Sequence, residues 1–258
     1  MTTVNDILME MEAFAPPALA ETWDNVGLLV GRAQAEIHTV LTALDVTEAV
    51  VREAAGCGAG LIVAHHPVIF GGVKRVTDED ATGRTLLALM ESRVAAICMH
   101  TNLDAADGGV NDCLAAALGV EGAEALASAD NHCKAGEVAQ CAFPDFMEMI
   151  RARLSCGGLR YMDAGRPVRR VAVGSGSCGE YVRAVHAAGC DTFVTADVKY
   201  NYMLEAAALG LNVVDAGHFS DGGCGRRPDD RKAQRALPVR PVFEIARTRR
   251  HGALCIAH

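Results

Sequence analysis

Short apolar runs alternate with amphipathic segments along most of the chain. The apolar runs predict buried strands at 39–44, 60–65, 94–100, 168–174, 191–197 and 211–218. Between them, stretches such as 46–56 and 83–93 repeat apolar residues at helical spacing. This alternation predicts an α/β fold with mostly parallel sheets and helices packed outside them.

The chain also repeats itself. Residues 40–66 match 171–197 in the order of their predicted elements, and 88–104 match 204–222 in the same way. We therefore predict a duplicated α/β unit in which two lobes face a cleft, because ligands of open α/β sheets bind at the carboxyl ends of the strands. No low-complexity linker interrupts the chain, so 1–258 is interpreted as one two-lobed domain. Its predicted parts are repeat halves at about 1–119 and 168–258 and a connecting subregion at about 120–167.

Charge and cysteine usage narrow the function classes. The net charge of −8 argues against a nucleic-acid binder, which would need clustered cations. The first residues are acidic rather than basic and predict a helix, and no apolar run is long enough to span a membrane. The 10 cysteines are scattered singly, which is typical of free thiols in a reducing compartment. We expect a cytoplasmic protein without a membrane partner.

Polar residues gather where the predicted strands end. They are His65 and His66, His100 and Asp104, Asp197 and Lys199, and finally Asp215, His218 and Asp221. Imidazoles and carboxylates suit divalent Zn, Mn, Fe or Co, whereas a lone strand-end histidine is more often a hydrogen-bonded structural residue. The combination of several such histidines favours a metal site. The remaining histidines are expected at the surface: His38, His132, His186, His251 and His258.

The adjacent pair His65 and His66 bears on how many ions are bound. Successive side chains of an extended strand point to opposite faces, so one ion would rarely take both imidazoles. Two ions could take one each, with Asp104 bridging them, as in known two-metal hydrolytic sites. We therefore predict two divalent metal ions per chain.

Two further stretches have competing interpretations. GSGSCG at 174–179 fits a dinucleotide fingerprint, with Asp197 at about the right distance, but the repeat places Asp197 at the position of the histidine pair and already explains an acid there. Its glycine-rich backbone could instead hold a substrate phosphate or carboxylate. In ETWDNVGLLVG at 21–31, Trp23 is interpreted as a packing residue, and Asp24 and Asn25 as residues that line the cleft.

Together these motifs resemble those of the dinuclear-metal-centre proteins called GTP cyclohydrolase 1 type 2 homologs, the Nif-three-like family. The resemblance rests on ETWDNVGLLVG, AHHPVIF, HTNLDAADGGVNDCLA, TADVKYNYMLEAA and VVDAGH, which occur in the family's order from residue 1 to about 220. It implies a duplicated α/β fold and a ring-shaped (toroidal) homohexamer.

The resemblance also implies the metal ligands His65, His66, Asp104 and His218, with His100 as a neighbour of the site. The family's fifth ligand is an acid four residues after the last histidine, where this chain has Gly222; Asp221 stands one residue earlier. We therefore name Asp221 as the candidate fifth ligand and expect the second metal site to be weaker.

Two functions follow from the resemblance. The first is a metal-dependent hydrolase of a small heterocyclic or phosphorylated metabolite, similar to a GTP cyclohydrolase. The second is a non-catalytic metal-binding or regulatory ring protein. The sequence identifies neither the substrate nor the catalytic residues.

Overall fold

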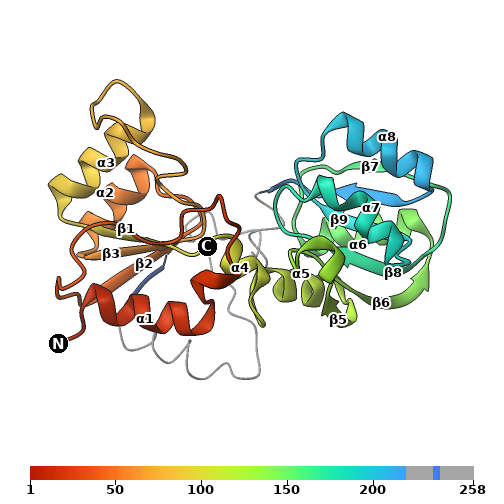
Figure 1. Ribbon diagram of the computed structural model, residues 1–258, viewed down its shortest axis with the longest axis horizontal. Helices are drawn as coiled ribbons and strands as arrows, with labels where there is room; N and C mark the ends of the chain where they lie inside the picture. Colours follow the sequence, from red (N-terminus) through yellow and green to blue (C-terminus); the bar gives the residue numbers. More distant parts are fainter. Residues whose placement is uncertain (219–234, 239–258) are drawn as a thin grey trace. The chain divides into compact units, whose positions relative to one another are not determined.

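The protein is described here from a computed structural model, which covers residues 1–218 and 235–238 (Figure 1). Its contacts divide the chain into two units. The first holds Met1–Ala106 together with strand β11 (Arg235–Pro238), and the second begins at Asp107.

The first unit is built around a sheet with the strand order β1-β4-β3-β2-β11. The neighbours β2, β3 and β4 run parallel, whereas β1 and β11 pair antiparallel at the two edges. The elements are α1 (Val4–Phe14), the short 3-10 helix η1 (Pro17–Leu19), β1 (Gly27–Val30), β2 (Thr39–Ala43), α2 (Glu48–Gly56), β3 (Leu61–Ala64), α3 (Ala81–Ser92), β4 (Ala95–Cys98), α4 (Thr101–Ala105) and β11.

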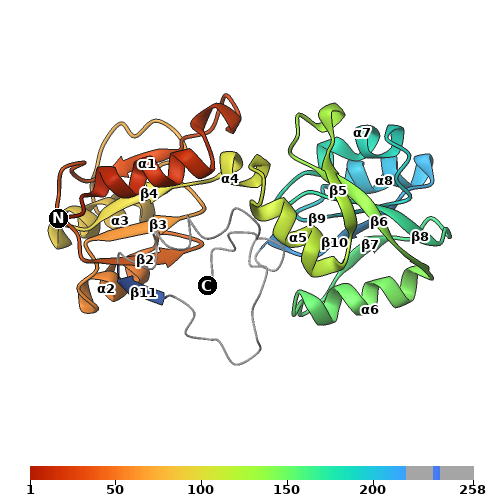
Figure 2. The same ribbon diagram turned by 90° about the horizontal axis from the view of Figure 1, so that it is seen from below.

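Helices cover both faces of this sheet. Figures 1 and 2 show α2 and α3 together on one face and α1 on the other. Ile62 and Ala64 of β3 pack with Val51 and Leu89 into the core under α2 and α3. Every residue of β3 is buried, as expected for a central strand covered on both sides.

The second unit has a sheet with the order β5-β6-β8-β9-β10-β7, in which β8, β9 and β10 run parallel and the other pairings are antiparallel. The elements are α5 (Val110–Leu118), β5 (Glu121–Ala125), η2 (Ala127–Ala129), β6 (Lys134–Cys141), α6 (Phe143–Arg153), β7 (Arg160–Met162), β8 (Val168–Val173), η3 (Gly179–Tyr181), α7 (Val182–Ala187), β9 (Thr192–Thr195), α8 (Tyr200–Leu209) and β10 (Asn212–Asp215).

The two units repeat one order of elements. The order α1-β1-β2-α2-β3-α3-β4 of the first recurs as α6-β7-β8-α7-β9-α8-β10 in the second. In each, the first strand of the series pairs antiparallel with the last, at the same edge of the parallel strands. The repeat thus includes α6 and β7, which lie within the stretch expected to connect the halves. The division into repeat halves remains a prediction.

The predicted α/β class is confirmed. Parallel pairing joins β2, β3 and β4 in the first sheet and β8, β9 and β10 in the second, and a helix lies between each two successive strands of these runs, as parallel pairing requires. No helix in the described part of the chain is both long and apolar enough to cross a bilayer. The cysteines among residues 1–218 are free thiols.

Candidate metal centre

The parallel strands of the first unit end level with one another. Ala43 pairs with Ala64, and Ala64 pairs with Cys98, so the residues that follow β2, β3 and β4 leave the sheet at the same edge. Backbone bonds continue the pairing one step further, from His65 N–H to the Ala43 carbonyl and from Met99 N–H to the Ala64 carbonyl. This register brings Asp45, His65, His66 and His100 to one place.

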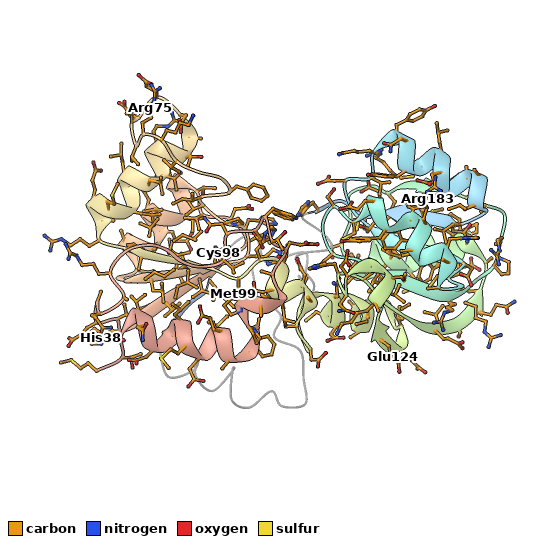
Figure 3. The ribbon with its side chains drawn as sticks, viewed as in Figure 1. His38, Arg75, Cys98, Met99, Glu124 and Arg183 are labelled. Atoms are coloured by element: carbon orange, nitrogen blue, oxygen red, sulfur yellow. The ribbon has the colours of Figure 1, made fainter. Side chains whose placement is uncertain are left out.

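His65 is held by the residues at the end of β4. Its Nδ1 lies 2.9 Å from the carbonyl oxygen of Met99, and the thiol of Cys98 donates to the carbonyl of His65 at 2.9 Å; Figure 3 labels both partner residues. Burial lowers the pKa of His65 to about 4, although the Asp104 carboxylate opposes this by raising it. His65 is therefore a neutral imidazole at neutral pH, the form that binds metals.

His66 lies beside His65 on the same side of the strand end. Their ring centroids are 4.9 Å apart, and Nδ1 of His66 lies 2.7 Å from Oδ1 of Asp45. The expectation that the two rings point to opposite faces is wrong, because β3 ends at Ala64 and strand alternation does not extend to the pair. The geometry therefore does not separate the two imidazoles.

His100 completes the cluster from the end of β4. Its ring centroid lies 5.2 Å from that of His65 and 5.6 Å from that of His66. Nδ1 of His100 lies 2.8 Å from Oδ1 of Asp24, whose side chain is fully buried and also accepts from the hydroxyl and backbone N–H of Thr101. Burial raises the pKa of Asp24, but the hydrogen bonds from His100 and Thr101 outweigh it and hold that pKa below its usual range. Asp24 is thus ionised at neutral pH.

These three histidines could hold a metal ion, since one nitrogen from each lies within 4.8 Å of the others. Asp104, on α4, adds a carboxylate oxygen 3.7 Å from Nε2 of His65. That separation is too long for a hydrogen bond. It suits two ligands of one ion, because an ion about 2.1 Å from each of two tetrahedral ligands holds them roughly 3.4 Å apart.

The hydrogen bonds also fix which nitrogen of each ring carries the proton. The Met99 carbonyl and the carboxylates of Asp24 and Asp45 can only accept, so Nδ1 carries the proton in all three imidazoles. In a neutral ring the lone pair then lies on Nε2. Metal-binding histidines in proteins are commonly oriented in this way by an acceptor on the other nitrogen.

The second unit repeats the arrangement once within its described residues. His218 follows β10, and its Nδ1 lies 2.8 Å from Oδ2 of Asp197, which follows β9. A side chain at Gly176 would place its Cβ 3.4 Å from Nε2 of His218, so glycine there leaves that nitrogen more open. Asp215 serves the fold instead, accepting from the backbone of Val198 and Gly217.

The structure thus brings together His65, His66 and Asp104 as the sequence predicts, and adds His100, which was expected only as a neighbour. Asp221, like Gly222, lies outside the described residues. The Cys98 thiol stays protonated, because burial and the nearby Asp24 and Asp104 raise its pKa.

Sequence reasoning named Asp24 and Asp197 but not their role in orienting the rings. Asp45 was not singled out, although an acid directly after a strand that neighbours the histidine pair was the available signal. Two interpretations are wrong: Trp23 is 55% exposed rather than packed, and His132, expected at the surface, is buried. The backbone N–H of Ser175 in GSGSCG donates to Asn111, so this part of the loop is used within the fold.

Comparison with known proteins agrees with the motifs. The chain matches the family described as Duf34/NIF3 (NGG1p interacting factor 3) over residues 2–223. It is 32% identical to a Clostridium perfringens protein named GTP cyclohydrolase 1 type 2 homolog, over 84% of this chain and 86% of that one. It is 34% identical to a Streptomyces coelicolor protein of the same name, over 85% of this chain and 81% of that one.

The fold is similar to that of a solved Bacillus cereus protein related to NIF3. The TM-score is 0.80 at 26% sequence identity, and the match covers 86% of this chain and 90% of the other. Sequence and fold therefore agree over most of the chain, and the protein belongs to the Duf34/NIF3 (NGG1p interacting factor 3) family.

Proposed function

We propose that this protein binds two divalent metal ions and hydrolyses a small heterocyclic or phosphorylated metabolite. The observation that carries the proposal is the shared setting of His65, His66, His100 and His218: each places Nδ1 against an acceptor oxygen. A histidine with a purely structural role needs a hydrogen bond at one ring nitrogen only, and either nitrogen can make it. Packing alone does not require that Nδ1 makes this bond in all four residues. A set of oriented Nε2 atoms is what metal binding requires.

The proposed ligands are His65, His66, Asp104, His218 and Asp221. For the first three the support is their proximity in the first unit. For His218 it is the bond to Asp197, judged from the second unit alone. For Asp221 it is only the position in the sequence, next to the expected acid. Divalent ions held by such residues supply Lewis-acid activation of water and of the bond to be cleaved.

The chain's own residues prepare this chemistry. Asp24 and Asp45 keep their histidines oriented, and the buried Asp104 places a carboxylate beside His65. Because these groups are fixed before a ligand arrives, little reorganisation is needed on binding. A non-catalytic metal-binding or regulatory role is the second candidate, favoured by Gly222 at the position of the expected acid.

Turnover separates the two functions. We expect protein loaded with Zn²⁺, Mn²⁺, Fe²⁺ or Co²⁺ to hydrolyse at least one member of a panel of phosphomonoesters, phosphodiesters and GTP, the substrate that the relatives' names suggest. The activity should disappear with a chelator and return with the metal. Tight metal binding without turnover of any member would favour the non-catalytic role.

Substitution of His65 or His66 by Ala should lower metal content, because each removes an oriented Nε2. Loss of a residue that only hydrogen-bonds a metal ligand costs roughly 10- to 100-fold in metal affinity, and loss of the ligand itself should cost more. Elemental analysis of dialysed protein measures the effect. His38→Ala, at an exposed position of the same unit, is the control. A full complement of metal in both variants would rule out His65 and His66 as ligands.

Gly222, which replaces the expected acid, should make the two metal sites unequal in affinity. We expect one ion to bind firmly and the other to exchange, since Gly222 offers no ligand atom. Gly222→Glu should raise occupancy toward two ions per chain, and Asp221→Ala should lower it. Calorimetric titration with Zn²⁺ after chelator treatment reports both affinities. Two equal, tight sites in the wild type and in Asp221→Ala would contradict this assignment.

We also propose a toroidal homohexamer, on the strength of the family resemblance. A chain of 27.1 kDa would then give a particle of roughly six times that mass by light scattering. A mass near that of one chain, at concentrations where metal binding is measured, would contradict the hexamer while leaving the metal proposal intact.

A further inference from the structure

Two exposed aromatic side chains stand beside the histidine cluster. Trp23 is 55% exposed and Phe70 is 61% exposed, although large aromatic side chains are usually mostly buried. Their ring centroids lie 5.6 Å apart, and each lies 6.1 Å from the ring of His100. The pair therefore presents open apolar rings next to the candidate metal ligands.

The backbone around Trp23 anchors this pair to the cluster. The two residues after Trp23 make the contacts. Asp24 accepts a hydrogen bond from Nδ1 of His100 at 2.8 Å. Asn25 donates from Nδ2 to the carbonyl of Ile69 at 2.6 Å, which fixes the backbone just before Phe70. Consecutive residues thus tie Trp23 to both His100 and Phe70. The aromatic pair is positioned by the same contacts that orient a candidate ligand.

The geometry limits how a ligand could use these rings. A ring sandwiched between two others needs about 7 Å between their centroids, twice the roughly 3.5 Å carbon contact distance. At 5.6 Å and an angle of 38°, Trp23 and Phe70 already contact each other. A planar ligand must therefore stack on an outer face of the pair, in the offset arrangement that aromatic rings favour.

We propose that Trp23 and Phe70 form a stacking platform that binds the planar heteroaromatic ring of the substrate. The inference rests on the proposed function, since it assumes that the histidine cluster acts on the ligand held there. It assigns ring recognition to two named residues and predicts discrimination against saturated metabolites. Stacking is tolerant of the ring's identity, because every heteroaromatic base has a π face.

The charged residues near Phe70 give no preference for an anionic ligand. Phe70 also borders a hollow of about 700 Å³, whose charged lining residues are Lys74, Arg75, Glu79 and Asp80. These charges balance, so this hollow gives no preference for a phosphate. The feature that distinguishes the platform is its exposed aromatic area.

The test compares ligands that differ only in the ring. Guanosine 5′-monophosphate and uridine 5′-monophosphate are titrated against ribose 5-phosphate, which has the same sugar and phosphate without a base. Trp23 is the chain's only tryptophan, so its fluorescence reports directly on the platform. We expect at least one nucleotide to quench this fluorescence and to bind about tenfold or more tightly than ribose 5-phosphate by calorimetry.

Variants locate the effect. Trp23→Ala and Phe70→Ala should each weaken nucleotide binding by about tenfold and leave ribose 5-phosphate unchanged, whereas Trp23→Phe should retain most of the affinity. Met9→Ala removes a similarly exposed apolar side chain from α1 of the same unit and should have no effect. Metal content, measured on every variant, should stay at the wild-type level.

The outcomes are distinguishable. If wild-type protein binds metal but binds both nucleotides no better than ribose 5-phosphate, the platform is overturned and the metal proposal stands. If it binds no metal, the proposed function fails whatever the nucleotides do. If Trp23→Ala changes the particle mass by light scattering without changing nucleotide binding, the aromatic pair is a contact between copies and the inference is wrong.

Discussion

The register of the parallel strands β2, β3 and β4 is the constraint on which the candidate centre depends. Because Ala43, Ala64 and Cys98 are level, the next residues of each strand emerge at one edge. A shift of one residue in any of these strands would exchange its faces and remove its polar residues from this edge. Burial of β3 on both sides makes such a shift costly, so the apolar core specifies the position of the histidines.

Orientation of the rings comes from parts of the chain that are distant in sequence. His65 uses the backbone carbonyl of Met99, the residue after β4, and His100 uses Asp24, which stands 76 residues earlier, before β1. Asp24 stays ionised because it accepts several hydrogen bonds, so it is a constant acceptor. Folding of the first unit therefore produces both the location of the imidazoles and the nitrogen that each presents.

The location of the histidines could be predicted from the sequence, whereas the orientation of their rings could not. The strands were predictable because their apolar runs are short and continuous, and His65 and His66 were recognisable because they follow such a run directly. Their mutual orientation was not, since it depends on β3 ending one residue before the pair. Trp23 was misjudged for a related reason: the sequence gives no sign that the Asp24 side chain in ETWDNVG is buried while that of the neighbouring tryptophan stays exposed.

The repeat gives a further physical reason for the histidine settings. His66 and Asp45 are 21 residues apart, and so are His218 and Asp197. In both pairs the acid follows one parallel strand and the histidine follows the next, with a helix between them. A β-α-β crossover returns the chain to the same edge of the sheet, so this spacing places the two side chains side by side.

The two Asp–His pairs use different members of the repeat. The first unit uses β2 and β3, whereas the second uses β9 and β10, which correspond to β3 and β4. Asp197 adopts a φ of 49°, which few residues other than glycine do, and still holds the imidazole. The two units thus reach one Asp–His arrangement through different members of the repeat, so the geometry of the β-α-β crossover, rather than the place of the strands in the series, sets it.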